Sequence, residues 1–322
     1  MITRWEHIKA KYSTAYAWRG VAWKVMRAVL VIGICFLILY PIFLKVVVSI
    51  MEERDLYDAT VTHVPKHVTW YNYEFAMETM SFWPAFLNTF FLSFLVATLQ
   101  VASCTLIAYG FARFEFPGKN VIFALVIFTL IVPPQTISIP LFMSFRFFNP
   151  IGFITGDRAG LNLLDSVWPY VLISSTGMGL KNGLYIYIIR QVFRGVPREL
   201  EESALVDGAG QLRTFAVIML PAAIPIMVTA FLFSFVWQWT DGFYSSLFLQ
   251  DFVVLSRQIG SLSMMAGQRL GAEAGTEFIL APAVTSQLNN AATVLMIIPL
   301  ILIYVIAQRS FVESIERSGI VG

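Results

Sequence analysis

Charged side chains are rare in the long apolar runs of this sequence, and two of them stand far from the first run. Lys181 lies in the glycine-rich stretch Gly177–Gly183, and Asp241 is flanked by Trp237 and Trp239. A charge at membrane depth costs at least about 2.5 to 3.5 kcal/mol, so such residues are functional candidates by default. Aromatic faces stack on sugar rings, and a carboxylate accepts hydrogen bonds from hydroxyl groups. The pattern therefore indicates a site for a polar, hydroxyl-rich solute.

The candidate solute path consists of Lys181, Asn182, Trp239 and Asp241. Other interpretations of these residues stay open. Tryptophans gather at membrane interfaces, and Asp241 lies near the end of its apolar run, so an interfacial belt is an equal alternative. Lys181 could sit at the outer interface or pair with Asp241. The glycines around Lys181 indicate a break in the helix, which is tolerated where a helix lines a cavity or packs within protein.

Catalysis by this chain is not expected. His63 and His67 stand four residues apart, but Pro65 between them breaks the helix that would align both rings on a metal ion. The sequence has no His-Glu-x-x-His motif and no paired carboxylates in its apolar runs. The stretch Pro117–Asn120 is superficially similar to a phosphate loop, yet Arg113 occupies the position of its first glycine. We therefore expect neither a metal site nor an ATP site in this chain.

A polar segment from Pro197 to Pro221 separates two of the apolar runs. Pro197 suits the first turn of a helix, and the acidic residues that follow favour the positive end of the helix dipole. Gly208 can adopt the left-handed backbone that caps a helix at its C-terminus. A second short helix is expected over Gln211–Met219, before the chain returns toward the membrane. The segment is thus predicted to fold as a pair of short helices.

Composition places these segments in an integral membrane protein. The chain of 322 residues is 57% hydrophobic and 13% charged, whereas a soluble domain carries roughly a quarter charged residues. A bilayer core requires about 20 apolar residues of helix. Six runs of this kind predict an all-α protein with six transmembrane helices, at Val29–Val48, Ala85–Ala108, Val121–Phe145, Val167–Ile189, Met227–Leu247 and Ala291–Ala307.

The basic residues predict the orientation of these helices. Arg4, Lys9 and Lys11 are among the many basic residues before the first run, where Glu6 is the only acid. By the positive-inside rule the N-terminus is expected in the cytoplasm. Six spans then return the C-terminus to the same side, together with the polar segment between the fourth and fifth spans. The asymmetry of basic residues supports this even number of spans, and no nucleic-acid-binding pattern is present.

The polar segment resembles the loop signature of binding-protein-dependent ABC transporter permeases. That signature is Glu-Ala-Ala, three residues, glycine, nine residues, isoleucine, one residue, Leu-Pro. It is matched here by Glu202, Ser203, Ala204, Gly208, Ile218, Leu220 and Pro221, with Ser203 replacing the first alanine. The resemblance to the sugar-importer branch covers nearly the whole chain. It includes Ala108–Phe114, Pro133–Gln135, Arg190–Phe193, Trp237–Asp241 and Gln308–Val312, as in the second permease of maltose-type uptake systems.

The resemblance implies a type I ABC importer permease fold with a coupling-helix loop. Residues 1–28 would be a cytoplasmic N-terminal segment, 29–307 the six-helix permease domain with its coupling loop at 194–221, and 308–322 a cytoplasmic tail. In such proteins the two short helices dock in a cleft of an ATPase subunit and transmit its motion to the spans. The residues expected to couple are Glu202, Ser203, Ala204, Asp207, Gly208, Ile218, Leu220 and Pro221.

The family also implies the partners and the location. We expect a second permease subunit in a heterodimer, two ATPase subunits that bind ATP and Mg, and an extracytoplasmic solute-binding protein, in the inner membrane of a bacterial or archaeal cell. This chain would bind no cofactor. The expected solute is an oligosaccharide, with glycerol phosphate or another polyol as the alternative. A channel or a secondary transporter is a more remote alternative, because neither requires the polar helical pair and no inverted repeat is visible.

Overall fold

The computed structural model describes residues 15–150, 160–275 and 279–319, with side chains described for 20–150, 160–275 and 279–308. The start of the predicted N-terminal segment, the last three residues and the side chains of the predicted tail beyond Gln308 lie outside the described residues. The helices are α2 (Ala15–Ser49), α3 (Glu53–Leu56), α4 (Tyr71–Thr79), α5 (Phe82–Arg113), α6 (Lys119–Phe128), η1 (Pro134–Ile137), α7 (Ser138–Arg146), α9 (Trp168–Ser175), α10 (Asn182–Gly195), α11 (Arg198–Val206), α12 (Gln211–Thr214), η2 (Phe215–Met219), α13 (Leu220–Trp239), α14 (Phe243–Phe248), α15 (Leu255–Ala274) and α16 (Pro282–Gly319).

The predicted all-α class is confirmed, and the described part of the chain divides into two compact units. One unit runs through Glu74 and includes Ala281–Val294; the other comprises Phe75–Leu280 and the chain from Leu295 onward. Four helical stretches are long and apolar enough to cross a membrane: Gly20–Ser49, Phe82–Arg113, Gln211–Trp239 and Pro282–Gln308. They correspond to the first, second, fifth and sixth predicted spans.

The third and fourth predicted spans are each divided into two shorter helices. In the third, α6 ends at Phe128 and α7 begins at Ser138, because Pro133 is held in an extended conformation that stops the helix. In the fourth, α9 ends at Ser175 and α10 begins only after Lys181, whose φ of 61° is left-handed. The break expected around Lys181 is thus observed. The fifth span begins earlier than predicted and ends at Trp239.

In the smaller unit, the end of α2 is held by a buried asparagine. Asn72 Nδ2 donates to the carbonyl oxygens of Ser49, at 3.0 Å, and Met51, at 2.9 Å. The loop that follows is organised by the buried carboxylate of Asp55, which accepts hydrogen bonds from the backbone N–H groups of Lys66 and His67. Most of the apolar surface of α2 is exposed, as befits a helix that faces lipid or another subunit.

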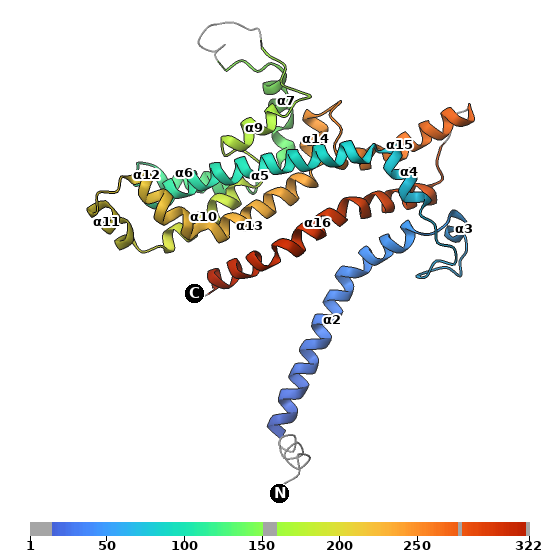
Figure 1. Ribbon diagram of the computed structural model, residues 1–322, viewed down its shortest axis with the longest axis horizontal. Helices are drawn as coiled ribbons and strands as arrows, with labels where there is room; N and C mark the ends of the chain where they lie inside the picture. Colours follow the sequence, from blue (N-terminus) through green and yellow to red (C-terminus); the bar gives the residue numbers. More distant parts are fainter. Residues whose placement is uncertain (1–14, 151–159, 276–278, 320–322) are drawn as a thin grey trace. The chain divides into compact units, whose positions relative to one another are not determined.

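In the larger unit, α5 is the central helix and packs against α9, α10 and α13 (Figure 1). A buried polar contact joins three of these helices. Gln100 on α5 donates through Nε2 to Oδ1 of Asn182 on α10, at 2.8 Å, and accepts a hydrogen bond from the Ser234 hydroxyl on α13. A Cβ atom at Gly179 would overlap the Gln100 amide, so a glycine is required there. Such a buried polar contact between helices favours one register of their packing.

Candidate functional site: the helical pair

The first helix of the predicted pair begins and ends where the sequence indicates. Pro197 is extended and α11 starts at Arg198, with Glu199 and Glu201 in its first turn. At the other end, Gly208 has a φ of 81°. Its N–H donates to the Leu205 carbonyl, and the N–H of Ala209 donates to the Ala204 carbonyl. These two hydrogen bonds form a Schellman cap, which confirms the predicted helix end.

The second predicted helix is not a separate element. Gln211–Thr214 form α12, but η2, a π-helical turn over Phe215–Met219, leads without interruption into α13. Ile218 packs at the edge of the core around α5 and α10, while Leu220 and Pro221 form the first turn of α13. The sequence pattern predicted that the second helix ends at Met219, before Pro221, but a proline in the first turn of a helix costs no hydrogen bond. The return limb of the pair is therefore an extension of a spanning helix.

Arg113 connects the helical pair to the central helix. It is the last residue of α5, and its Nε lies 2.5 Å from Oε1 of Glu201 on α11. The two side chains are only 7% and 16% exposed. Arg113 Nη2 also donates to the Val196 carbonyl, at 2.6 Å, just before α11 begins. Because Arg113 holds both the entry to α11 and its first turn, α11 cannot shift without disturbing α5.

The exposed surface of the pair is apolar over α11, which lies outside the long spanning helices, and at Leu212, at the start of the stretch Gln211–Trp239. Leu200 and Leu205 of α11 are 50% and 49% exposed, and Val206 and Leu212 are 87% and 86% exposed. Glu202, Ser203 and Asp207 are also exposed, and Ala204 is half-buried. Contiguous exposed apolar side chains rimmed by polar ones mark a surface that binds a partner. We call Leu200, Leu205, Val206 and Leu212 the apolar surface of the pair (Figure 1, α11 and α12).

Of the four candidate solute-path residues, Lys181 is half-buried and the other three are buried. Its ammonium lies 5.0 Å from the centre of the Trp237 ring, a cation–π arrangement. It does not pair with Asp241, which was one interpretation of the sequence. The Asp241 carboxylate instead accepts hydrogen bonds from the N–H groups of Tyr244 and Ser245 and so caps the start of α14.

Asn182 and Trp239 lie in the interior of the larger unit. Asn182 is held by Gln100, as described above. Trp239 is fully buried, packs against Phe86 and Phe235, and donates through Nε1 to the Met296 carbonyl at 3.2 Å. The exposed tryptophan next to Lys181 is Trp237, which is 47% exposed. An all-round apolar helix such as α13 gives no periodic signal that would have told the two tryptophans apart.

His63 and His67, the two histidines four residues apart, have separate partners. The Tyr40 hydroxyl lies 2.9 Å from His63 Nε2, and His67 Nδ1 lies 2.8 Å from the Asp55 carboxylate. Among the described residues, no group of three or more His, Cys, Asp and Glu side chains could hold a metal ion.

Arg113 and Gln100 were not singled out from the sequence as site residues. Arg113 does stand in the stretch Ala108–Phe114 that carries part of the family resemblance, and that is the signal that could have drawn attention to it. Its partner Glu201 is far away in the sequence, so the ion pair itself leaves no local pattern.

Comparison with protein families gives one match that covers more than half of the chain. The model described as binding-protein-dependent transport system inner membrane component matches residues 103–317. The alpha-glucoside transport system permease protein AglG of Rhizobium meliloti is 29% identical over 273 residues, which are 84% of this chain and 64% of that protein. The sn-glycerol-3-phosphate transport system permease protein UgpE of Yersinia pestis is 28% identical over 298 residues, 90% of this chain and 94% of that protein.

Two further comparisons agree with these. The osmoprotective compounds uptake permease protein GgtD of Synechocystis is 29% identical over 249 residues, 77% of this chain and 74% of that protein. Among solved structures, a chain of a bacterial ABC transporter involved in the import of the acidic polysaccharide alginate superimposes with a TM-score of 0.68 at 21% identity, over 90% of this chain and 96% of that one. The fold expected from the sequence is the fold of this neighbour.

Proposed function

The chain belongs to the family of binding-protein-dependent transport system inner membrane components, and from that premise we propose how it is driven and what it carries. It is a multi-pass membrane subunit of a transport system, and its role is that of a permease rather than of an enzyme. We propose that an oligosaccharide, delivered by an extracytoplasmic binding protein, crosses the membrane by alternating access while a separate subunit hydrolyses ATP. Glycerol phosphate or another polyol is the alternative solute.

The observation that carries the proposal is the apolar surface of the helical pair together with its anchor. Leucine and valine side chains exposed outside a membrane span lose free energy in water unless a partner covers them. A force applied to α11 passes to α5 through the Arg113–Glu201 ion pair, and a force on α12 passes directly into α13. The pair is thus built to dock on another protein and to move two core helices with it.

We propose the remaining partners from the type of transport system to which the family belongs. ATP and Mg would bind in two ATPase subunits, and the pair, the N-terminus and the C-terminus would lie in the cytoplasm. A second permease subunit, in a heterodimer, would complete the path for the solute. The exposed apolar surface of α2 is available for that contact or for lipid. Of the coupling residues, Glu202, Ser203 and Asp207 would meet the ATPase directly, while Ala204 and Gly208 shape the end of α11.

For the solute path, we propose that Lys181 and the exposed face of Trp237 meet the solute. Aromatic faces stack on sugar rings, and an ammonium group suits hydroxyl oxygens as well as phosphate. Asn182 lies next to Lys181, and its Nδ2 has no hydrogen-bond partner in the described part of the chain. It can donate to a solute when the path opens. Trp239 and Asp241 would not contact the solute themselves but would hold the residues that do.

Co-purification from a membrane extract tests the docking surface. Val206→Asp places a charge in the centre of the apolar surface and is expected to abolish recovery of the ATPase subunit with the tagged permease. Val64→Asp is the matched control, because Val64 is also strongly exposed, at 75%, but lies in the loop between α3 and α4. Equal recovery of the ATPase with both variants would overturn the proposed role of the pair.

A further inference from the structure

A basic pocket opens beside the helical pair, and neither the coupling role nor the solute path uses it. It has a volume of about 340 Å³ and lies between the end of α5, the start of α6, the end of α10 and the start of α11. Lys119, Arg190, Arg194 and Arg198 line it, together with Glu115 as the only carboxylate. We call this set of residues the basic pocket.

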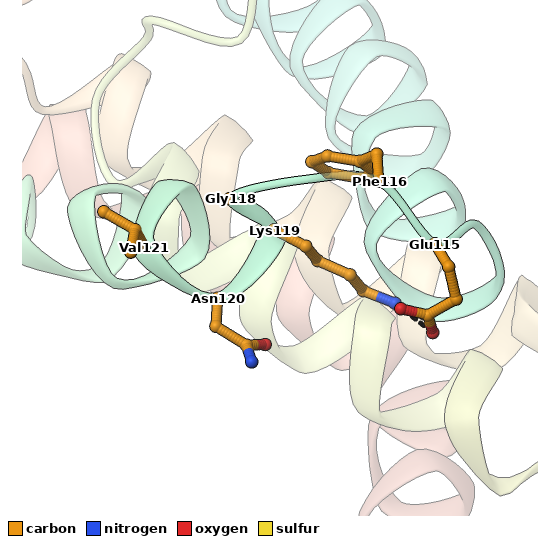
Figure 2. A pocket seen from close by; sticks show the side chains of 6 residues that line it. All are labelled: Glu115, Phe116, Gly118, Lys119, Asn120 and Val121. Carbon is orange, nitrogen blue, oxygen red and sulfur yellow. Dashed lines mark hydrogen bonds and ion pairs between the residues drawn. The ribbon is translucent and has the colours of Figure 1, made fainter.

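The single carboxylate is already engaged by one of the four cations. Lys119 Nζ lies 3.0 Å from Oε1 of Glu115 (Figure 2). It also donates to the Phe114 carbonyl at 2.8 Å. The hydrogen bond from Lys119 and, more weakly, the charge of Arg198 hold the pKa of Glu115 below its usual value. Glu115 is therefore ionised near pH 7, and its ion pair is with Lys119.

The three arginines have no carboxylate of their own. In the part of the chain whose side chains are described, neither Arg190 nor Arg194 nor Arg198 forms an ion pair. Arg190 is fixed in place, because its guanidinium lies 3.9 Å from the centre of the Phe123 ring and its Nε donates to the Phe111 carbonyl. Arg194 follows one helical turn later and is exposed. Like charges at this spacing repel each other unless an anion lies between them.

The surface next to the pocket is apolar. Lys119 and Asn120, which line the basic pocket, are the first residues of α6. The rest of α6 is apolar and none of its residues is buried. Val121, Ile122, Leu125 and Phe128 all expose their side chains. A ligand with a negative group in the pocket could therefore lay a hydrocarbon chain along α6.

We infer that the basic pocket binds the phosphate group of an anionic phospholipid whose acyl chains lie along α6. Guanidinium groups bind phosphate oxygens through paired hydrogen bonds, and basic pockets between membrane helices bind lipid headgroups in this way. An acidic side chain of a partner protein would satisfy the charges as well, but it would leave the apolar side chains of α6 uncovered. The inference requires only that this end of α5 and α10 lies at a membrane surface, so it stands apart from the transport proposal.

Native mass spectrometry of the complete transporter, released from nanodiscs of phosphatidylcholine and phosphatidylglycerol, tests the inference. Wild type is expected to retain phosphatidylglycerol in preference to phosphatidylcholine. Each exposed arginine near an anionic lipid contributes about fivefold in affinity, so Arg194→Gln with Arg198→Gln is expected to lower retention about 25-fold. Arg213→Gln is the matched control, since Arg213 is an exposed arginine of α12 outside the pocket and its loss is expected to change nothing.

Each other outcome would overturn the inference. Equal lipid retention by wild type and the double variant would remove the pocket as the site. Displacement of phosphatidylglycerol by millimolar inorganic phosphate would show that the pocket takes a free phosphate instead. Loss of the ATPase subunit with lipid retention unchanged would show that a protein carboxylate fills it. The unfolding temperature in pure phosphatidylcholine is expected to be equal for all variants, which would show that a lower lipid retention reflects the loss of the site. If the double variant unfolds at a lower temperature than wild type, Arg194→Gln alone repeats the test, with an expected fivefold loss of retention.

Discussion

The Arg113 guanidinium and the Glu201 carboxylate lie 2.5 Å apart in a nearly buried ion pair. Arg113 ends the central helix α5, and Glu201 belongs to the short helix α11, which the proposed ATPase contact would move. The two side chains of this ion pair are close, but Arg113 Nε and Glu201 Oε1 do not form a hydrogen bond with each other. The ion pair joins α5 to α11, so the two helices are expected to move together.

Glu201→Gln is expected to loosen α11 from α5. Removing one member of a buried ion pair leaves the other charge uncompensated, which lowers the free energy of unfolding by about 3 kcal/mol. Transported solute per ATP hydrolysed should fall, because ATPase motion would no longer reach α5. Glu199→Gln removes the same charge from an exposed residue of the same helix that is not among the coupling residues, and should leave the unfolding temperature unchanged. Equal effects of the two variants on both readouts would contradict a specific role of the ion pair.

Gly208→Ala is expected to destabilise the cap of α11. A left-handed backbone costs a residue with a Cβ atom about 1 to 2 kcal/mol. Apart from adjacent residues, no atom of the described residues lies within 4 Å of the added Cβ, so the backbone conformation alone accounts for the loss. Solute-stimulated ATP hydrolysis in proteoliposomes should fall severalfold. Gly210→Ala is the control, since Gly210 has a φ of −71° and open space around it. The idea fails if Gly210→Ala is impaired as much as Gly208→Ala.

Gln100→Leu should weaken the packing of α5 on α10 and α13. The substitution leaves Oδ1 of Asn182 and the Ser234 hydroxyl without their buried partner, and each such group costs about 1 to 3 kcal/mol. Thermal unfolding in detergent measures the loss. Thr98→Val on the same helix removes a hydroxyl that is exposed and bonds only to its own helix, so that variant should unfold at the wild-type temperature. A wild-type unfolding temperature for Gln100→Leu would refute this account of the helix packing.

The loop between α3 and α4 is expected to loosen in acid. Burial raises the pKa of Asp55, but hydrogen bonds from His67 and Lys66 outweigh it, so the pKa lies below its usual 3.8. The carboxylate therefore stabilises the loop at neutral pH, and this contribution is lost as pH falls below about 4. Hydrogen exchange of the loop amides measures the effect. Asp55→Asn should exchange fast at pH 7 and show no further change in acid; a wild-type loop whose protection survives at pH 2 would contradict the prediction.

Local features of the fold could be predicted from the sequence, whereas contacts between distant residues could not. The cap at Gly208, the start of α11 after Pro197 and the break at Lys181 depend on a few adjacent residues, and the structure has all three. The third span was predicted as one run over Val121–Phe145, whereas the structure divides it at Pro133. A proline pair removes N–H donors and pushes the preceding residue out of the helical region, which suffices to end a helix.

The site residues divide in the same way. The sequence identified Lys181 and Asp241 because charges stand out in apolar runs, but it could not tell that Lys181 turns to Trp237 and that Asp241 caps α14. It proposed Trp239 where the exposed ring is that of Trp237. It also could not pair Arg113 with Glu201 or Gln100 with Asn182, since such contacts arise only when the helices are packed.

Hydrogen exchange of the permease with and without its purified ATPase subunit tests the central claim most directly. If the helical pair docks on the ATPase, amides over residues 198–212 should exchange markedly more slowly in the complex, while those of the loop between α3 and α4 should not change. Unchanged exchange over 198–212 in a complex that hydrolyses ATP and carries solute would show that the helical pair is not the coupling element.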